Sequence, residues 1–195
     1  GTPVRVCAQD CYFQDTGAFT GEVSAPLLKD AGATHVIVGH SERRQYFGDT
    51  DELVGKKVSA VLGHGLVPIV CVGESEKERD QGVTFERVTQ HINGALAGVS
   101  DEEARTVVIA YEPVWAIGTG KTATPAQAEE VHAFIRQKLA DRFGRAANDM
   151  RIQYGGSVKP DNAAELLRQP NIDGALVGGA SLDVESLVRI ARASR

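Results

Sequence analysis

The residues best suited to acid–base chemistry stand at the ends of two apolar runs. Glu112 closes the run TVVIAYE at 106–112, and His40 follows the run HVIVG at 35–39. A carboxylate in a dry setting has a raised pKa and can remove a proton near neutral pH, so Glu112 is a candidate general base. The competing interpretations are a structural ion pair for Glu112 and ordinary packing for His40.

The residues after His40 indicate how its charge is controlled. Ser41 to Arg44 can begin a short helix, and the positive end of its dipole would lower the pKa of His40 and keep the ring neutral. A neutral imidazole can donate a hydrogen bond to a substrate carbonyl. Glu42 is expected to be a buried or paired acid that supports this turn, while Arg43 and Arg44 are expected to pair with nearby acids.

The loop after Glu112 is unusually apolar. Val114 to Ile117 lie between Pro113 and Gly118, although loops are normally polar because they face water. We expect this loop to fold over a bound substrate and to exclude water from it. Proline at one end and glycine at the other limit where the loop can bend.

A nucleotide-binding loop is excluded in the same segment. Gly120-Lys121-Thr122 resembles the end of a phosphate-binding P-loop, but that motif requires glycine where this chain has Trp115. Lys121 is therefore expected to be a solvated loop lysine.

Paired glycines follow the last two apolar runs of the chain. Gly155 and Gly156 precede Ser157 in YGGSV, and Gly178 and Gly179 stand in LVGGAS. Either pair alone is ordinary turn chemistry. Together they match the place where α/β barrels bind phosphate through backbone N–H groups and a helix N-terminus, a site that needs no arginine cluster.

Short apolar runs alternate with helical patterns, which is typical of repeated βα units and a parallel sheet. Helices are predicted from about residue 49 to 62, from 125 to beyond 139, and over 184–193. Both an open doubly wound sheet and a (β/α)8 barrel fit, but reactive or small residues at five strand ends favour one ring of loops, as in a barrel. The six predicted strands cover residues 4–8, 35–39, 67–73, 106–112, 151–155 and 174–178.

Composition narrows the class of protein. The chain of 195 residues has a net charge of −5 and no block of like charge, which argues against a nucleic-acid partner and favours a small substrate. Its three cysteines do not suit a disulfide framework and lack zinc-ligand spacing, so neither disulfides nor a metal site is expected. With no run of membrane-spanning length, no signal peptide and no linker, we expect a cytoplasmic protein with one domain over 1–195.

Five segments along the chain carry a common signal: DTGAFTGEVS, VIVGHSERR, AYEPVWAIGTGKTATP, IQYGGSV and DGALVGGASL. Taken together, these segments closely resemble the triosephosphate isomerase family. The resemblance implies that Glu112 moves a proton between two carbons of a triose phosphate and that His40 is a neutral electrophile. It further implies that Gly118, Ser157, Gly178 and Gly179 hold the phosphate, and that glyceraldehyde 3-phosphate and dihydroxyacetone phosphate interconvert through an enediol or enediolate without metal or cofactor.

The resemblance also carries expectations about assembly and completeness. The loop around Gly17–Glu22, with Phe19 in it, resembles one that reaches into a partner subunit, so a homodimer is expected. Such barrels have roughly 250 residues and eight βα units. Six units are predicted for this chain, so we expect an N-terminally truncated TIM barrel. Such a barrel would lack the substrate-contacting asparagine and lysine that end the family's first strand.

Two other classes of function stay open at this stage. One is an inactive fragment or phosphate-binding module that lacks the N-terminal catalytic lysine. The other is a different sugar-phosphate enzyme of the same fold, such as an epimerase or a synthase, which would need other acid and base residues at the strand ends. The pairing of His40 with Glu112 and the apolar loop favour the isomerase over the latter.

Overall fold

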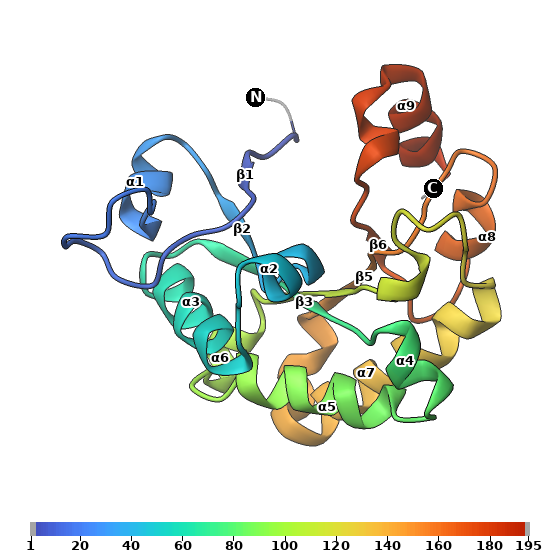
Figure 1. The fold of residues 1–195 in the computed structure, drawn as a ribbon, viewed down its shortest axis with the longest axis horizontal. Helices are drawn as coiled ribbons and strands as arrows, with labels where there is room; N and C mark the ends of the chain where they lie inside the picture. Colours follow the sequence, from blue (N-terminus) through green and yellow to red (C-terminus); the bar gives the residue numbers. More distant parts are fainter. Residues whose placement is uncertain (1–2, 194–195) are drawn as a thin grey trace.

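A parallel six-stranded sheet forms the centre of the computed structural model, which describes residues 3–193. Each strand pairs with the next one along the chain, and the sheet bends into an open arc (Figure 1). The strands are β1 (Cys7–Ala8), β2 (His35–Val38), β3 (Val67–Val72), β4 (Val108–Tyr111), β5 (Arg151–Tyr154) and β6 (Gly174–Ala175).

All six predicted strands are confirmed, although the end strands are shorter than expected. β1 keeps only two of the five predicted residues, and Val4 and Val6 before it are 77% and 61% exposed. β6 is likewise limited to Gly174–Ala175. Within residues 3–193, β1 and β6 each pair with a single neighbour, so fewer backbone hydrogen bonds extend them.

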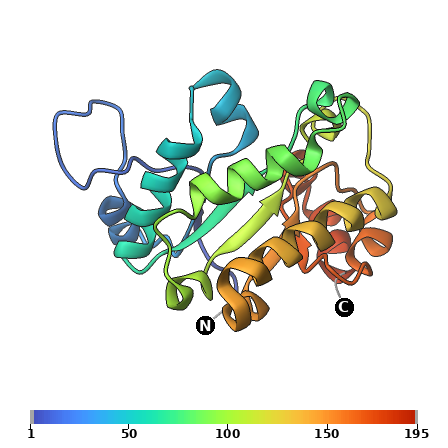
Figure 2. The same cartoon turned by 90° about the horizontal axis from the view of Figure 1, so that it is seen from below.

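Three long helices cover the outer side of the arc, where α3 packs on α5 and α5 on α7 (Figure 2). They are α3 (Asp51–Gly63), α5 (Thr84–Ala95) and α7 (Pro125–Phe143), of which α3 and α7 were predicted. Both predicted starts are capped: Thr50 caps α3, and Thr124 with Gln127 forms a capping box on α7. No helix of residues 3–193 is both long and apolar enough to cross a membrane.

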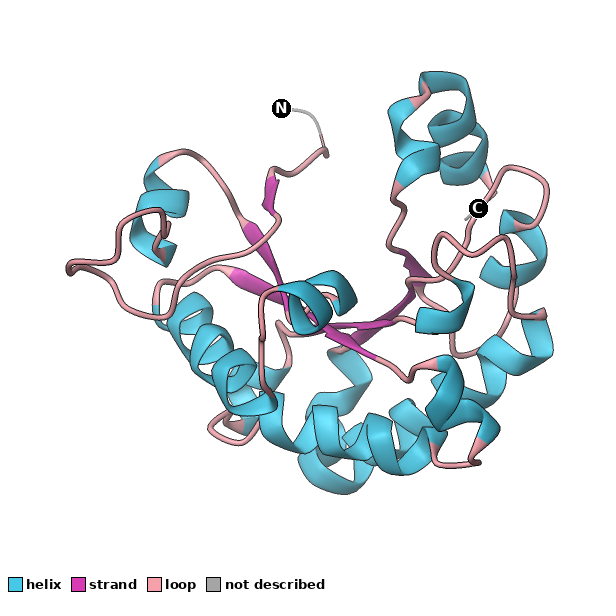
Figure 3. Ribbon diagram, in the orientation of Figure 1, coloured by secondary structure: helices cyan, strands magenta, loops and turns pink. Residues whose placement is uncertain are grey.

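Shorter elements complete the outer layer and the loops at the strand ends (Figure 3). The C-terminal helix over 184–192 agrees with the prediction. These elements are α1 (Ala25–Asp30), α2 (Ser41–Tyr46), α4 (Glu76–Asp80), α6 (Asp101–Ala104), α8 (Ala163–Leu167) and α9 (Val184–Arg192), with 3-10 turns η1 (Val114–Ala116), η2 (Gly144–Asp149) and η3 (Gly179–Leu182).

Apolar side chains lie on both faces of the central strands, as expected for a covered parallel sheet. On β3, Val70 and Val72 join the main core between sheet and helices, whereas Ile69 and Cys71 join a smaller cluster on the opposite face. Because successive side chains of a strand alternate in direction, the second cluster lies inside the arc. The strand ends are therefore held from both sides.

Candidate functional site

A cavity of about 680 Å³ opens where the C-terminal ends of the strands meet. Parallel strands bring these ends to one edge of the sheet, so residues far apart in the sequence line the same space. All six residues predicted for the site line this cavity: His40, Glu112, Gly118, Ser157, Gly178 and Gly179. The structure thus brings together everything that the sequence had placed in one site.

His40 and Glu112 contact each other directly. Nε2 of His40 lies 2.9 Å from Oε1 of Glu112, and the backbone N–H of Ser41 donates to Oε2 at 2.9 Å. Glu112 is only 2% exposed, while the His40 side chain is 27% exposed. The carboxylate is therefore fixed on both oxygens at the floor of the cavity, and the imidazole lies above it at the first turn of α2.

The protonation pattern of His40 follows from its two contacts. Nδ1 accepts a hydrogen bond from the backbone N–H of Glu42 at 3.3 Å, which assigns the ring proton of the neutral form to Nε2. The expectation that the helix dipole lowers the pKa was wrong. The hydrogen bond to the Glu112 carboxylate raises the pKa of His40 above its ordinary value, and this effect outweighs the lowering by burial.

The neighbours of His40 on α2 differ in how well they were predicted. Arg43 pairs with Asp10 at 2.7 Å and Arg44 pairs with Asp51 at 2.6 Å, which confirms both arginines as ion-pair partners. Glu42 was expected to be buried or paired. It is not buried, since its side chain is 66% exposed, but it forms a long ion pair of 3.9 Å with Nδ1 of His40 and lines the cavity.

The main chain of Glu112 is enclosed by glycines on two neighbouring strands. A Cβ atom at Gly73 would lie 1.8 Å from the carbonyl oxygen of Glu112, and one at Gly155 would lie 3.0 Å from its Cγ. Any larger side chain at Gly73 would displace the base. Burial, and after it the nearby Glu112 charge, raises the pKa of the Cys71 thiol well above its ordinary value, so Cys71 stays a neutral neighbour.

A second buried acid, Glu74, holds the start of the loop that follows Glu112. It accepts hydrogen bonds from Tyr111 Oη at 3.1 Å and Trp115 Nε1 at 2.9 Å, and it pairs with Arg79 at 3.0 Å. The Arg79 guanidinium also lies 4.7 Å from the centre of the Trp115 ring. Sequence analysis gave Glu74 no role, although it ends an apolar strand just as Glu112 does.

The loop itself, residues 113–121, lies along the cavity. Ile117 and Gly118 line it, and Gly118 and Gly120 adopt φ angles of +69° and +82°, which glycine adopts without strain. Lys121 is exposed, as expected, but it is more than a solvated lysine because it pairs with Glu76 on α4. Both ends of the loop are thus tied to the segment that follows β3.

The opposite wall of the cavity consists mainly of backbone. Gly178 and Gly179 are exposed, and their positions are held by the hydrogen bonds that Ser181 donates to the Gly178 carbonyl through its backbone N–H at 2.9 Å and its hydroxyl at 2.6 Å. Asn162 similarly donates to the Ser157 carbonyl at 3.0 Å. This wall can offer N–H groups to an anion, and Lys159 adds a positive side chain to the lining.

The loop predicted to contact a partner projects from the body between β1 and α1 (Figure 2). The Phe19 ring in this loop packs against Tyr12 with a centroid distance of 4.6 Å and is 36% exposed. Tyr46 and Phe47 at the end of α2 are also exposed, at 69% and 67%. In residues 3–193 there is no cluster of three or more His, Cys, Asp or Glu side chains arranged to hold a metal ion.

Comparison with known proteins agrees with this geometry. A family model described as triosephosphate isomerase matches residues 1–194. The chain is 58% identical over 192 residues to the triosephosphate isomerase of Trichlorobacter lovleyi and 58% identical over 190 residues to that of Moorella thermoacetica, and it covers 76% of each protein. A crystal structure of the enzyme from Bartonella henselae superposes with a TM-score of 0.91 at 44% identity, over 99% of this chain and 78% of that one.

Proposed function

The chain belongs to the triosephosphate isomerase family, and from this premise we propose that it interconverts glyceraldehyde 3-phosphate and dihydroxyacetone phosphate with Glu112 as the base and His40 as the electrophile. The single observation that carries these roles is the contact of 2.9 Å between His40 Nε2 and Glu112 Oε1 at the floor of the cavity. A proton acceptor and a proton donor thus lie side by side at the floor of the cavity, which supports their action on neighbouring atoms of one substrate.

Two groups of this chain carry the proposed proton transfers. Glu112 removes a proton from the carbon next to the carbonyl, and the electron pair of that C–H bond forms the carbon–carbon double bond of an enediolate. The carbonyl oxygen takes the negative charge and receives the hydrogen bond from His40 Nε2. The hydroxyl proton on the neighbouring oxygen then moves to the former carbonyl oxygen, with His40 as the donor and acceptor between them, and Glu112 returns its proton to the former carbonyl carbon, so that aldehyde and ketone exchange places and no atom is gained or lost.

Substrate binding has to change the partner of His40. Its Nε2–H donates to Glu112 in the structure, and a substrate carbonyl would take over that hydrogen bond. The exchange frees one carboxylate oxygen to act as a base. It also removes the interaction that raises the pKa of His40, while burial continues to favour the neutral ring.

The phosphate is assigned to the wall formed by Gly118, Ser157, Gly178 and Gly179. Its exposed backbone and the ring of loop residues suit a dianion held by N–H groups, with Lys159 at the same cavity. Loop 113–121 would close on this phosphate and bring Ile117 over the reacting carbons. Exclusion of water there protects an enediolate that would otherwise lose phosphate.

The proposal extends to the whole molecule. The six βα units correspond to six of the eight units of a (β/α)8 barrel in a single domain, which agrees with the 76–78% of the relatives that the chain covers. Exposed Phe19, Tyr46 and Phe47 support a homodimer formed through the loop around residues 17–22. Three free cysteines support a cytoplasmic location.

Turnover of glyceraldehyde 3-phosphate by the purified chain tests the assignment. We expect the Glu112→Gln variant to lose about 100- to 10,000-fold in kcat with an unchanged fold, because this is the typical contribution of a general base and an amide cannot accept the proton. Glu52→Gln is the matched control, since the Glu52 side chain is 77% exposed and pairs with Lys56 on the surface of α3. Equal activity of Glu112→Gln and the wild type would exclude Glu112 as the base.

The same assay decides between the isomerase and a phosphate-binding module. Binding of inorganic phosphate without any turnover by the wild-type chain would favour the module, which lacks the family's N-terminal lysine. Tight binding of a planar phosphorylated hydroxamate, which resembles the enediolate, would favour the isomerase.

A further inference from the structure

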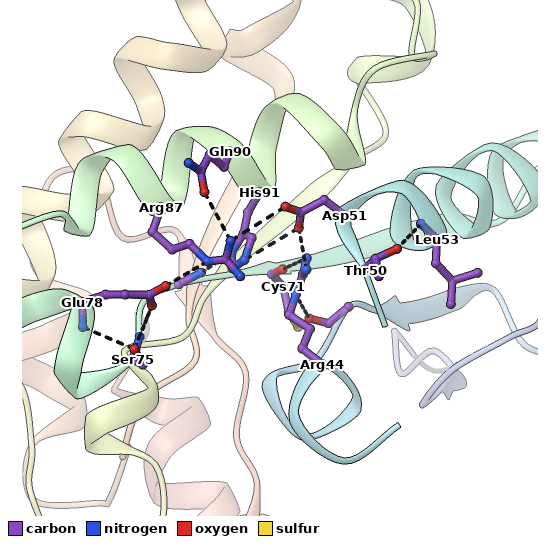
Figure 4. Close-up of polar contacts among 12 residues, drawn as sticks. Arg44, Thr50, Asp51, Leu53, Cys71, Ser75, Glu78, Arg87, Gln90 and His91 are labelled. Atoms are coloured by element: carbon purple, nitrogen blue, oxygen red, sulfur yellow. Dashed lines mark hydrogen bonds and ion pairs between the residues drawn. The ribbon is translucent and has the colours of Figure 1, made fainter. Parts of the chain in front are cut away.

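A buried histidine outside the cavity contacts the backbone beside the base. His91 lies on α5, is 3% exposed, and its Nδ1 accepts a hydrogen bond from the backbone N–H of Gly73 at 3.1 Å. Its Nε2 points toward Asp51 on α3, 3.7 Å from Oδ1, and has no hydrogen-bond partner within residues 3–193 (Figure 4). The ring therefore connects the helical layer to the C-terminal end of β3.

The charge and the tautomer of His91 are fixed by its surroundings. Burial first, and then the positive charges of Arg44 and Arg87, lower the pKa of His91 to about 3, so the ring is neutral. Because Nδ1 accepts from Gly73, the ring proton is on Nε2 and faces the Asp51 carboxylate. Asp51 in turn accepts from Arg44 at 2.6 Å.

The residue that His91 holds is packed directly against the main chain of the proposed base. Gly73 lies against the main chain of Glu112, where even a Cβ atom would come within 1.8 Å of the Glu112 carbonyl oxygen. The Glu112 N–H donates to the carbonyl of Val72, the preceding residue, at 2.7 Å. A shift of the Gly73 peptide would therefore move the backbone of Glu112 with it.

Asp51 is also connected to the backbone next to His40. Arg44, bound to Asp51, donates through Nε to the carbonyl of Gly39 at 2.9 Å, and Gly39 immediately precedes His40. A longer contact of 3.5 Å joins Nη2 of Arg44 to the carbonyl of Cys71 on β3 (Figure 4). Asp51 thus contacts two side chains that bind the backbone of the site. Arg44 binds the backbone before His40, and His91 binds the backbone beside Glu112.

We propose that His91 is a positioning residue for the isomerase reaction, which acts through Gly73 to hold Glu112 in the position from which it removes the substrate proton. The inference rests on the proposed function of Glu112. His91 does not line the cavity, so we expect its effect on the chemical step and not on phosphate binding. A histidine that only filled the core would be replaceable by any side chain of similar volume.

Two variants separate these possibilities. His91→Leu fills the space but leaves the Gly73 N–H without an acceptor, whereas His91→Asn places an amide oxygen near the position of Nδ1. We expect His91→Leu to lower kcat about tenfold with KM within about twofold of the wild type, and His91→Asn to stay within about threefold in kcat, because small displacements of a reacting group are costly. Ile92→Ala on the same helix is the control for destabilisation alone, and it should leave kcat unchanged.

Hydrogen exchange of the Gly73 amide, followed by NMR without substrate, gives a readout that does not depend on turnover. Its protection should fall in His91→Leu and be largely kept in His91→Asn. Unchanged protection in His91→Leu, or equal kcat losses in the Leu and Asn variants, would overturn the inference. A wild-type chain without turnover would instead count against the proposed function, and the exchange measurement would still report on the His91–Gly73 bond.

Discussion

The two walls of the cavity are built in opposite ways. On the wall of His40 and Glu112, the carboxylate is buried, both of its oxygens accept hydrogen bonds, and the strands behind it are packed on both faces. On the wall of Gly178 and Gly179 the backbone is exposed, and a Cβ atom at either glycine would meet nothing within 4 Å. The two proposed catalytic groups are thus fixed by packing and hydrogen bonds, whereas the proposed phosphate-binding backbone is open.

This difference fits the roles proposed for the two walls. Proton transfer is sensitive to displacements of a few tenths of an ångström, and a packed core can keep the reacting groups within such limits. Phosphate binding needs several N–H groups that can converge on a large anion, and exposed glycines allow its oxygens to approach the backbone closely. Substitutions on the first wall should therefore change kcat and stability, and those on the second should change affinity.

The largest effect is expected on the buried wall. His40→Gln should lower kcat at least about 100-fold with little change in KM, because the donor to the substrate carbonyl is misplaced. Urea denaturation should also show a free energy of unfolding lower by about 1–2 kcal/mol, since a buried carboxylate loses a hydrogen-bond donor. His64→Gln is the control, because His64 is a partly exposed histidine that pairs with Asp15 away from the cavity.

The glycine wall should respond in the reverse manner. Gly179→Val should weaken the binding of inorganic phosphate and raise KM by about tenfold, because a branched side chain covers the backbone N–H groups that face the cavity, while kcat changes much less. The free energy of unfolding should stay within about 0.5 kcal/mol of the wild type, as is usual for exposed positions. A loss of kcat with unchanged phosphate affinity would contradict the division between the walls.

The next largest effect is the pH dependence of stability and of kcat/KM, which arises from His40 on the buried wall. Glu112 raises the pKa of His40, so the folded protein holds the proton more tightly than the unfolded chain does. The stabilisation is complete below about pH 6.5, the ordinary histidine value, and is lost as pH rises through the folded pKa. NMR titration should give His40 a pKa above 6.5 in the wild type and a lower one in Glu112→Gln, and kcat/KM should fall on the acid side at the wild-type value.

Sequence analysis predicted the residues of both walls because their signals are local. A charged or polar residue after an apolar run identifies a strand end, and parallel strands bring such ends together, so Glu112, His40 and the paired glycines could all be placed. The length of β1 could not be predicted, because it depends on hydrogen bonds to neighbouring strands. The pKa of His40 depends on a contact with Glu112 between two distant segments, and no local pattern reports that distance.

The roles of the residues that hold the site in place, His91 and Glu74, could not be predicted for a related reason. His91 looks like any polar residue on an amphipathic helix, and only the packing of α5 against β3 brings it to the Gly73 amide. Glu74 did leave a signal, since it ends an apolar strand as Glu112 does. Which of the two acids faces the cavity and which one anchors the loop was decided by the tertiary structure.

The smallest effect is expected at the far end of loop 113–121, where Lys121 pairs with Glu76 on α4. Lys121 and Glu76 form an ion pair with side chains that are 57% and 55% exposed, and such surface pairs contribute at most about 1 kcal/mol. Lys121→Gln should therefore change phosphate affinity by less than about fivefold and should lower the fluorescence anisotropy of Trp115. Trp115 is the one tryptophan of the chain and lies in this loop, so its signal needs no added label.

Salt and a double substitution show whether the pair itself is responsible. Exposed charges are screened at an ionic strength of about 0.5 M, so the difference between Lys121→Gln and the wild type should largely disappear there. Glu76→Gln should behave like Lys121→Gln, and the double variant should add nothing, because either substitution alone already breaks the pair. Additive effects that persist at high salt would mean that Lys121 acts on the phosphate directly, and the loop would then belong to the phosphate wall alone.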